Sequence, residues 1–192
     1  CTFPLAAVRK TCVELGEAAI VMGQGILGAM AVQFLHAAGA YPVIAADPVP
    51  SRRDFALTIG ADLALDPTDA DFAAQVKEST QGGCNAAIEV SGQGKALDTV
   101  LDCMAKCGRV ALLGCTRDPN FTIDYYRKIH GPGITLIGAH TLARPDTESH
   151  PGWWTHRDDM RATLALQHGG RIHIDRILSE IHDPTEAQAV YD

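Results

Sequence analysis

Several patterns that point to particular partners are missing from this 192-residue sequence. No apolar run approaches the ~20 residues that a membrane-spanning helix needs. There is no run of Lys and Arg, and the formal net charge is −7, so the chain lacks the basic patch that attracts nucleic acid or an anionic membrane. We therefore expect neither nucleic acid nor a membrane as a partner.

Catalytic and metal-binding motifs are also missing. The six cysteines include no C-x-x-C pair, and the eight histidines form no H-x-x-x-H or H-E pair. Cys103 and Cys107 stand four residues apart, which is not a usual zinc spacing. The stretch containing Asp146, Glu148 and His150 is more typical of a solvated loop than of a metal site. We expect no catalytic residue and no metal ligand in this chain, and buried free thiols in a reducing cytoplasm.

Predicted strands and helices alternate along most of the chain. The strands are expected near residues 18–22, 43–46, 62–65, 86–90, 109–113 and 134–139. Helices are expected near 25–38, after Ser51 as far as Gly60, and at 69–80 and 95–105, with Ser51 and Asp54 in a capping-box-like pair. This order indicates an α/β fold, a doubly wound parallel six-stranded sheet of the Rossmann type.

The character of the sequence changes after residue 141. Residues 142–192 are expected to form a helix–strand extension, with a helix from Thr155 to His168 and a half-buried strand over 172–177. Trp153-Trp154 is expected to cover a packing seam or a subunit contact, with an aromatic wall for a substrate as the alternative. We divide the chain into a linker helix at 1–15, a nucleotide-binding domain at 16–141 and the extension at 142–192.

Both ends of the chain suggest a piece of a longer protein. It begins with Cys1 rather than Met, and it stops inside a helix that Asp183 caps and Pro184 opens. We expect the linker helix to connect to a separate catalytic domain.

The most informative motif is Gly23-Gln24-Gly25-Ile26-Leu27-Gly28, which follows a predicted strand and opens a predicted helix. Asp47 lies 19 residues after Gly28, at the end of the next strand. Gly23 permits a tight turn, Gly25 lets the backbone approach a pyrophosphate, and Gly28 allows close packing of helix on sheet. The free N–H groups at the helix start favour phosphate. The combination is the fingerprint of a dinucleotide-binding site.

Asp47 also bears on the choice of cofactor. Its carboxylate can accept hydrogen bonds from the adenosine ribose hydroxyls, and it would repel a 2′-phosphate, so NAD is preferred over NADP. Arg52 and Arg53 stand close by, and an arginine can receive that phosphate. The sequence leaves open whether they do so or lie on a solvated helical turn.

A further set of segments carries a family resemblance. The chain is similar to the cofactor domain of medium-chain dehydrogenases. Within that family it most resembles the branch of zinc-type alcohol, polyol and threonine dehydrogenases. The resemblance covers roughly residues 1–141 and rests on these runs: Leu15-Gly16-Glu17, Val21 to Gly28, Ala46-Asp47, Ile59-Gly60-Ala61-Asp62, Ile88-Glu89-Val90-Ser91-Gly92, Gly108 to Gly114, and Leu136-Ile137-Gly138-Ala139.

The resemblance and the strand-end rule together suggest a set of cofactor-binding residues. Leu27 is placed near the pyrophosphate, Asp47 on the adenosine ribose with Arg52 beside it, and the ends of the last two strands at the nicotinamide carboxamide. The full set is Gly23, Gln24, Gly25, Ile26, Leu27, Gly28, Asp47, Arg52, Val90, Ser91, Leu113, Gly114, Cys115, Ala139, His140 and Thr141.

The resemblance also implies a function for the intact protein. The chain would be the NAD-binding domain of a zinc-dependent alcohol or polyol dehydrogenase, positioning nicotinamide for hydride transfer to or from an alcohol or carbonyl substrate. Zinc and substrate would belong to a separate GroES-like domain, and this chain alone would be inactive. Family members form dimers or tetramers through the last strand, here 134–139. A zinc-independent enone or quinone reductase, a non-catalytic NAD-sensing module and a methyltransferase remain alternatives.

Overall fold

The computed structural model describes residues 1–115 and 118–191. At its centre lies a six-stranded parallel sheet with the strand order β3-β2-β1-β4-β5-β6. The strands are β1 (Ala19–Met22), β2 (Val43–Ala46), β3 (Leu63–Leu65), β4 (Cys84–Glu89), β5 (Met104–Leu112) and β6 (Thr135–Gly138). This is the doubly wound Rossmann-type order, so the predicted fold class is confirmed.

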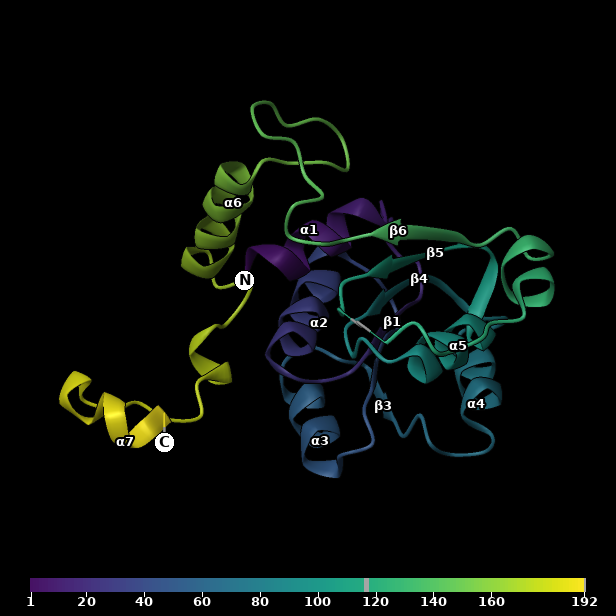
Figure 1. Ribbon diagram of the computed structural model, residues 1–192, viewed down its shortest axis with the longest axis horizontal. Helices are drawn as coiled ribbons and strands as arrows, with labels where there is room; N and C mark the ends of the chain where they lie inside the picture. Colours follow the sequence, from purple (N-terminus) through teal and green to yellow (C-terminus); the bar gives the residue numbers. More distant parts are fainter. Residues whose placement is uncertain (116–117, 192) are drawn as a thin grey trace.

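Helices cover both faces of the sheet (Figure 1). One face carries α1 (Thr2–Lys10), α2 (Ile26–Ala38) and α3 (Pro50–Thr58), and the other carries α4 (Phe72–Ser79) and α5 (Gly94–Asp102). α6 (His156–His168) packs on α1, and the short α7 (Ala187–Tyr191) ends an arm that extends away from the sheet (Figure 1). Short helical turns also occur at Tyr126–His130, Asp175–Ile177 and Pro184–Glu186.

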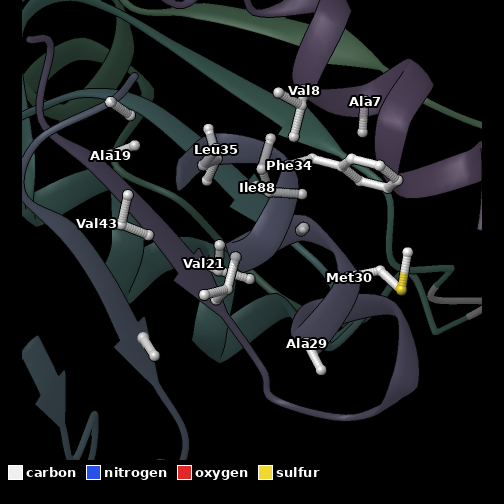
Figure 2. Close-up of a cluster of buried hydrophobic side chains, with 14 of the residues drawn as sticks. Ala7, Val8, Ala19, Val21, Ala29, Met30, Phe34, Leu35, Val43 and Ile88 are labelled. Carbon is white, nitrogen blue, oxygen red and sulfur yellow. The ribbon is translucent and has the colours of Figure 1, made fainter. Parts of the chain in front are cut away.

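The core consists of two apolar layers, one on each face of the sheet. In β1, Ala19 and Val21 belong to the layer under α1 and α2, whereas Ile20 and Met22 belong to the layer under α4 and α5. Figure 2 shows the first layer, in which side chains of α1, α2 and the strands meet. A strand buried on both faces is an almost continuous apolar run, which is why the sequence around β1 shows no alternation.

The register of the central strands brings three chain segments together. Met22 at the end of β1 pairs with Ala46 of β2 on one side and with Glu89 of β4 on the other. The connections that follow β1 and β4 lead to opposite halves of the sheet, so the switch in strand order lies between these two strands. The residues just after all three strands therefore lie at one point of the carboxyl edge, where ligands bind in such sheets.

The predicted strand over 172–177 is wrong. Ile172 is fully buried and Ile174 and Ile177 pack against the core, but the segment forms a loop and one helical turn. Its backbone is held by side chains and not by a neighbouring strand. The side-chain oxygen of Gln33 accepts the His173 N–H at 2.6 Å, and that of Gln167 accepts the Ile174 N–H at 3.0 Å. The alternation of apolar residues reflects packing on the core alone.

Smaller expectations have mixed outcomes. α3 begins after Val49 with Pro50 in its first turn and no side-chain cap, so the predicted cap at Ser51 is wrong. Thr155 does cap α6, and Asp183 forms a full capping box with Glu186.

The cysteines differ partly from the prediction. Cys84 and Cys103 are buried, whereas the remaining four are exposed: Cys1, Cys12, Cys107 and Cys115. The helix expected to reach residue 105 ends at Asp102, because β5 already begins at Met104. α1 lies within the segment predicted to be a linker helix, and its link to another domain stays a prediction.

Candidate functional site

A cleft of about 610 Å³ opens at the carboxyl edge of the sheet, where the loops after β1, β2, β3 and β4 meet. Nine residues of the predicted cofactor-binding set line it: Gly23, Gln24, Gly25, Ile26, Leu27, Asp47, Arg52, Val90 and Ser91. The structure thus brings together the parts of the set that the sequence assigned to pyrophosphate and adenosine ribose.

The glycine loop is built as its motif predicts. Gly23 has φ +99°, a conformation that side chains rarely adopt, and a Cβ there would lie 3.3 Å from the Ser91 backbone nitrogen. A Cβ on Gly28 would lie 1.9 Å from the Gly23 carbonyl oxygen, so α2 can pass this close to the loop only with glycine. Gly28 lies beneath the loop and does not line the cleft.

Gly25 has a different role, because a Cβ there would meet nothing within 4 Å. It is the N-cap residue of α2, and among the described residues no side chain caps this helix N-terminus. The backbone N–H groups of the first turn carry the positive end of the helix dipole. Open space in front of an uncapped helix start forms a cradle for an anion such as a pyrophosphate.

Asp47 joins two of the loops that form the cleft. Its carboxylate accepts the Gln24 N–H at 2.8 Å through one oxygen and the Val49 N–H at 2.9 Å through the other. It is only 3% exposed and still lines the cleft. Because an ionised carboxylate has about four acceptor positions, two backbone donors leave capacity for the hydroxyls of a ribose.

Gln24 contributes to the cleft through its backbone. Its side chain is buried, and the amide nitrogen donates to the Val21 carbonyl at 3.0 Å. The Gln24 side chain thus fixes the glycine loop to the end of β1, while the Gln24 backbone N–H donates to the Asp47 carboxylate.

The two arginines near Asp47 have different surroundings. Arg53 donates to the Asp66 carboxylate at 2.9 Å and to the Asp47 backbone carbonyl at 2.7 Å, and its side chain is 20% exposed. Arg52 lines the cleft with a side chain 54% exposed, and its guanidinium lies 3.6 Å from the Asp47 carboxylate. Arg52 is therefore available to a ligand, whereas Arg53 has a structural role.

Glu89, which sequence reasoning missed as a site residue, organises the ends of β4 and β5. Its carboxylate accepts the backbone N–H groups of Ser91 and Gly92 and the Ser91 hydroxyl. Its backbone carbonyl accepts the N–H groups of Leu113 and Gly114 at 2.9 and 2.7 Å. Burial raises the pKa of the Glu89 carboxyl, and the hydrogen bonds from Ser91 and Gly92 oppose this. The signal available in the sequence was an acid at the end of an otherwise apolar strand.

Six further residues of the predicted set lie at the ends of β5 and β6 and do not line the cleft: Leu113, Gly114, Cys115, Ala139, His140 and Thr141. These residues are close to the cleft loops. A Cβ on Gly92 would lie 2.9 Å from the Cys115 nitrogen, and the Ala139 N–H donates to the Leu112 carbonyl at 3.0 Å. The strand ends thus form a second group beside the cleft, on the β5–β6 side.

Comparison with known proteins shows to which family this chain belongs. A family model described as zinc-binding dehydrogenase matches residues 27–150. The chain belongs to the zinc-binding dehydrogenase family. This membership agrees with the resemblance found in the sequence.

One relative of this chain is L-threonine 3-dehydrogenase of Pyrococcus horikoshii. The two are 36% identical over 165 residues, a match that covers 85% of this chain and 44% of the relative. The chain therefore spans about half the length of the curated relatives it matches. Among solved structures, an alcohol dehydrogenase zinc-binding domain protein from Burkholderia ambifaria has a TM-score of 0.83 and 25% identity, covering 100% of this chain and 49% of that one.

A third comparison concerns the fold alone. The structure of a zinc-binding dehydrogenase from Sinorhizobium meliloti, bound to NADP, has a TM-score of 0.71 at 22% identity. The match covers 92% of this chain and 49% of the Sinorhizobium chain.

The cleft also contains residues that the sequence did not single out. Pro67 and Thr68 follow β3, and Gln93, Lys95 and Thr99 belong to the β4–α5 connection and α5. All lie beyond the carboxyl ends of parallel strands, the edge used to find Asp47 and Val90, so the same rule could have found them. Lys95 is exposed and adds a second cation to a cleft that already holds Arg52.

Other expectations concern metals and the extension. Among the described residues, no three His, Cys, Asp or Glu side chains are grouped as a metal would need. Within the same residues, no helix combines the length and apolar character required to cross a membrane.

The two tryptophans of the extension pack on α1. Trp154 stacks on Arg9, with the guanidinium carbon 3.5 Å from the ring centroid, and Trp153 packs on Lys10, so the pair lies in a packing seam with α1.

Proposed function

We propose that this chain binds NAD in the cleft and serves as the cofactor domain of an alcohol or polyol dehydrogenase. The observation that carries the proposal is the open space at Gly25 in front of the uncapped α2 N-terminus, with the buried Asp47 carboxylate at the neighbouring strand end. An anion cradle and a hydroxyl acceptor side by side fit the pyrophosphate and the ribose of a dinucleotide.

We also propose residues that hold the rest of the cofactor. In this proposal the backbone of Gly25 to Leu27 holds the pyrophosphate, and Val90 and Ser91 cover the cleft from the β4 side. The backbone at 113–115 and 139–141 holds the nicotinamide carboxamide. Nicotinamide, when bound, accepts or gives up a hydride. The chain's own contribution is to bind and orient it.

NAD is proposed over NADP because of Asp47. The acid faces the position of the ribose hydroxyls, and a 2′-phosphate there would meet like charge. Arg52 moderates this repulsion, since its guanidinium lies 3.6 Å from the same carboxylate. We therefore expect a preference for NAD of limited size.

The substrate and the reacting metal are proposed to belong to a separate catalytic domain. This rests on length, because the Pyrococcus relative is more than twice as long as the segment matched here. The proposed substrate is a small alcohol or carbonyl compound, held by catalytic-domain residues against the nicotinamide. Alone, this chain is expected to bind cofactor without turnover.

Assembly is proposed through β6, which ends the sheet. Thr135, Leu136 and Gly138 are exposed along this strand, and an unpaired edge is a template for pairing with another chain. We expect a homodimer, or a tetramer built from such dimers, joined at β6. Leu136→Lys should lower the mass measured by light scattering to that of a monomer, and a Leu136→Lys variant that stays dimeric would contradict this interface.

A reducing, cytoplasmic location is proposed from the thiols. All six cysteines are free, and four of them are exposed. Exposed thiols stay unpaired more readily where glutathione and thioredoxin keep them reduced.

Calorimetric titration of the chain with NADH and NADPH tests the cofactor assignment. The expected result is binding of NADH at one site per chain, with weaker binding of NADPH. A folded chain that binds neither nucleotide would overturn the proposal. Tighter NADPH binding would keep the nucleotide site and reverse the choice of cofactor.

A further inference from the structure

Lys10 is a buried lysine that lies outside the cleft. It is 6% exposed, although it is the last residue of α1 and carries a charged group. Its ammonium donates to the Gly138 carbonyl at 2.9 Å and to the Ala143 carbonyl, and it lies 4.3 Å from the centroid of the Trp153 ring. Because burial of a charge is costly, such a group persists only where its partners need it or compensate it.

The two carbonyls that Lys10 binds are the ends of one short segment. We call residues 138–143 the β6 hook, because the chain leaves the end of β6 and turns back on itself there. The turn is closed by the Ala143 N–H, which donates to the His140 carbonyl at 2.9 Å. The Leu142 N–H donates to the His140 ring at 3.2 Å. Lys10 thus spans the base of the hook, bonding its first and last residues.

The middle of the hook is the part that the proposed function uses. Ala139, His140 and Thr141 are the residues assigned to the nicotinamide carboxamide, and His140 and Thr141 are exposed. Their backbone positions depend on how the hook is closed. In addition to the turn's own hydrogen bonds, the two bonds from Lys10 fix the separation of the hook's first and last residues.

Lys10 is itself held rigidly. Most of α1 is buried against α2 and the sheet, and the Trp153 ring lies against the ammonium. Trp153 is in turn fixed by two backbone hydrogen bonds with His150, each of 2.9 Å. Burial lowers the pKa of Lys10, and nearby Arg144 lowers it further while Asp159 raises it. A rigid cation at the base of a turn can set the geometry of that turn.

We propose that Lys10 is a positioning residue, which holds the β6 hook in the shape that receives the nicotinamide carboxamide. The inference rests on the proposed function, since it concerns the nicotinamide end of the same cofactor. A compact ammonium has three donors and can bond two carbonyls at once, which a methionine side chain of similar length cannot do. Without the bonds, the hook opens and the nicotinamide loses its backbone partners, while the adenosine end keeps its own.

The test compares two nucleotides that differ only in the nicotinamide. NADH and ADP-ribose are titrated calorimetrically into the unchanged chain, Lys10→Met, and the control Lys106→Met, whose lysine is exposed on β5. In the unchanged chain and the control, NADH should bind more tightly than ADP-ribose. In Lys10→Met this difference should shrink by about tenfold, with the ADP-ribose affinity unchanged. General damage to the fold would weaken both nucleotides together.

The outcomes separate this inference from the proposed function. If Lys10→Met keeps the full difference between NADH and ADP-ribose, or if the unchanged chain shows no such difference, Lys10 does not position nicotinamide and nucleotide binding still stands. If the unchanged chain binds neither nucleotide, the proposed function fails and the inference fails with it.

A measurement on the unchanged chain covers the case in which Lys10→Met does not fold. The backbone amide resonances of Ala139 to Leu142, and the indole N–H resonance of Trp153, should shift when NADH replaces ADP-ribose. The chain has two tryptophans, so the indole signal is readily assigned. Resonances that stay the same with both nucleotides would overturn the inference.

Discussion

Arg53 is bound to Asp66, with its guanidinium nitrogen 2.9 Å from the carboxylate oxygen. The same nitrogen donates to the Asp47 backbone carbonyl at 2.7 Å, so Arg53 ties the end of β2 to the loop after β3. Arg52, its neighbour in sequence, points into the cleft region and lies 3.6 Å from the Asp47 carboxylate. The residue types alone do not distinguish these two arginines, whereas the family resemblance singled out Arg52. In the structure Arg53 has a structural role and Arg52 faces the cleft.

Asp47→Asn should relax the choice between cofactors. The substitution removes the negative charge that opposes a 2′-phosphate, and we expect the ratio of NADPH to NADH affinity to rise by about tenfold. Asp54→Asn removes an exposed carboxylate from α3 and should leave the ratio unchanged. Both ratios come from calorimetric titration. An unaltered ratio in Asp47→Asn would show that this acid does not face the ribose.

The two arginines should respond differently to replacement. Arg52→Ala should weaken NADPH more than NADH, because it removes the available cation beside the ribose position. Arg53→Ala should leave the ratio of the two affinities unchanged and lower the free energy of unfolding by about 1 kcal/mol, since it breaks a partly buried ion pair and a hydrogen bond. Urea denaturation and titration together distinguish the two effects, and a shifted ratio in Arg53→Ala would contradict the structural role.

Two glycines of the same motif should separate binding from stability. A Cβ on Gly25 has open space, so Gly25→Ala should keep the unfolding free energy within about 0.5 kcal/mol while nucleotide affinity falls by about tenfold. A Cβ on Gly28 would lie 1.9 Å from the Gly23 carbonyl, so Gly28→Ala should cost about 1–3 kcal/mol of stability or more. Thermal unfolding and titration check both. If Gly25→Ala kept its full affinity for the nucleotide, the α2 N-terminus would not be the pyrophosphate site.

The sequence predicted best those features whose causes lie within a few residues. The contact that requires Gly28 is made to Gly23, and the capping box of Asp183 is made to Glu186, so the motif itself contains both partners. The position of Asp47 beside the glycine loop needed only the general rule that parallel strands end at one edge. Fold class and the cleft followed from these local signals.

Features whose partners are distant in sequence could not be predicted. The carbonyls bound by Lys10 are 128 and 133 residues away, and nothing near Lys10 indicates them. Glu89 depends on the register between β4 and β5, which brings Leu113 and Gly114 to its carbonyl. The segment 172–177 shows the same limit. Alternating isoleucines look alike in a strand and in a loop, and the side chain that binds the His173 N–H belongs to Gln33, 140 residues away.

The pair of Glu17 and Arg109 should make stability depend on acid pH. The two Arg109 guanidinium nitrogens each donate to a Glu17 carboxylate oxygen, one of them at 3.0 Å, and join the loop before β1 to β5. These hydrogen bonds hold the pKa of Glu17 below its ordinary value of 4.5. A lowered folded-state pKa adds stability that is complete above 4.5 and is lost as the pH falls through the folded value.

Glu17→Gln should therefore destabilise the chain at neutral pH and have little effect in acid. We expect a loss of about 1 kcal/mol at pH 7, the size typical of a partly exposed bidentate pair, because glutamine cannot accept both donors. The difference from the unchanged chain should shrink as the pH drops below 4.5. Urea denaturation across this range measures it, with the exposed Glu14→Gln as the matched control. A difference that stays constant with pH would mean that the Glu17 carboxylate gains nothing from Arg109.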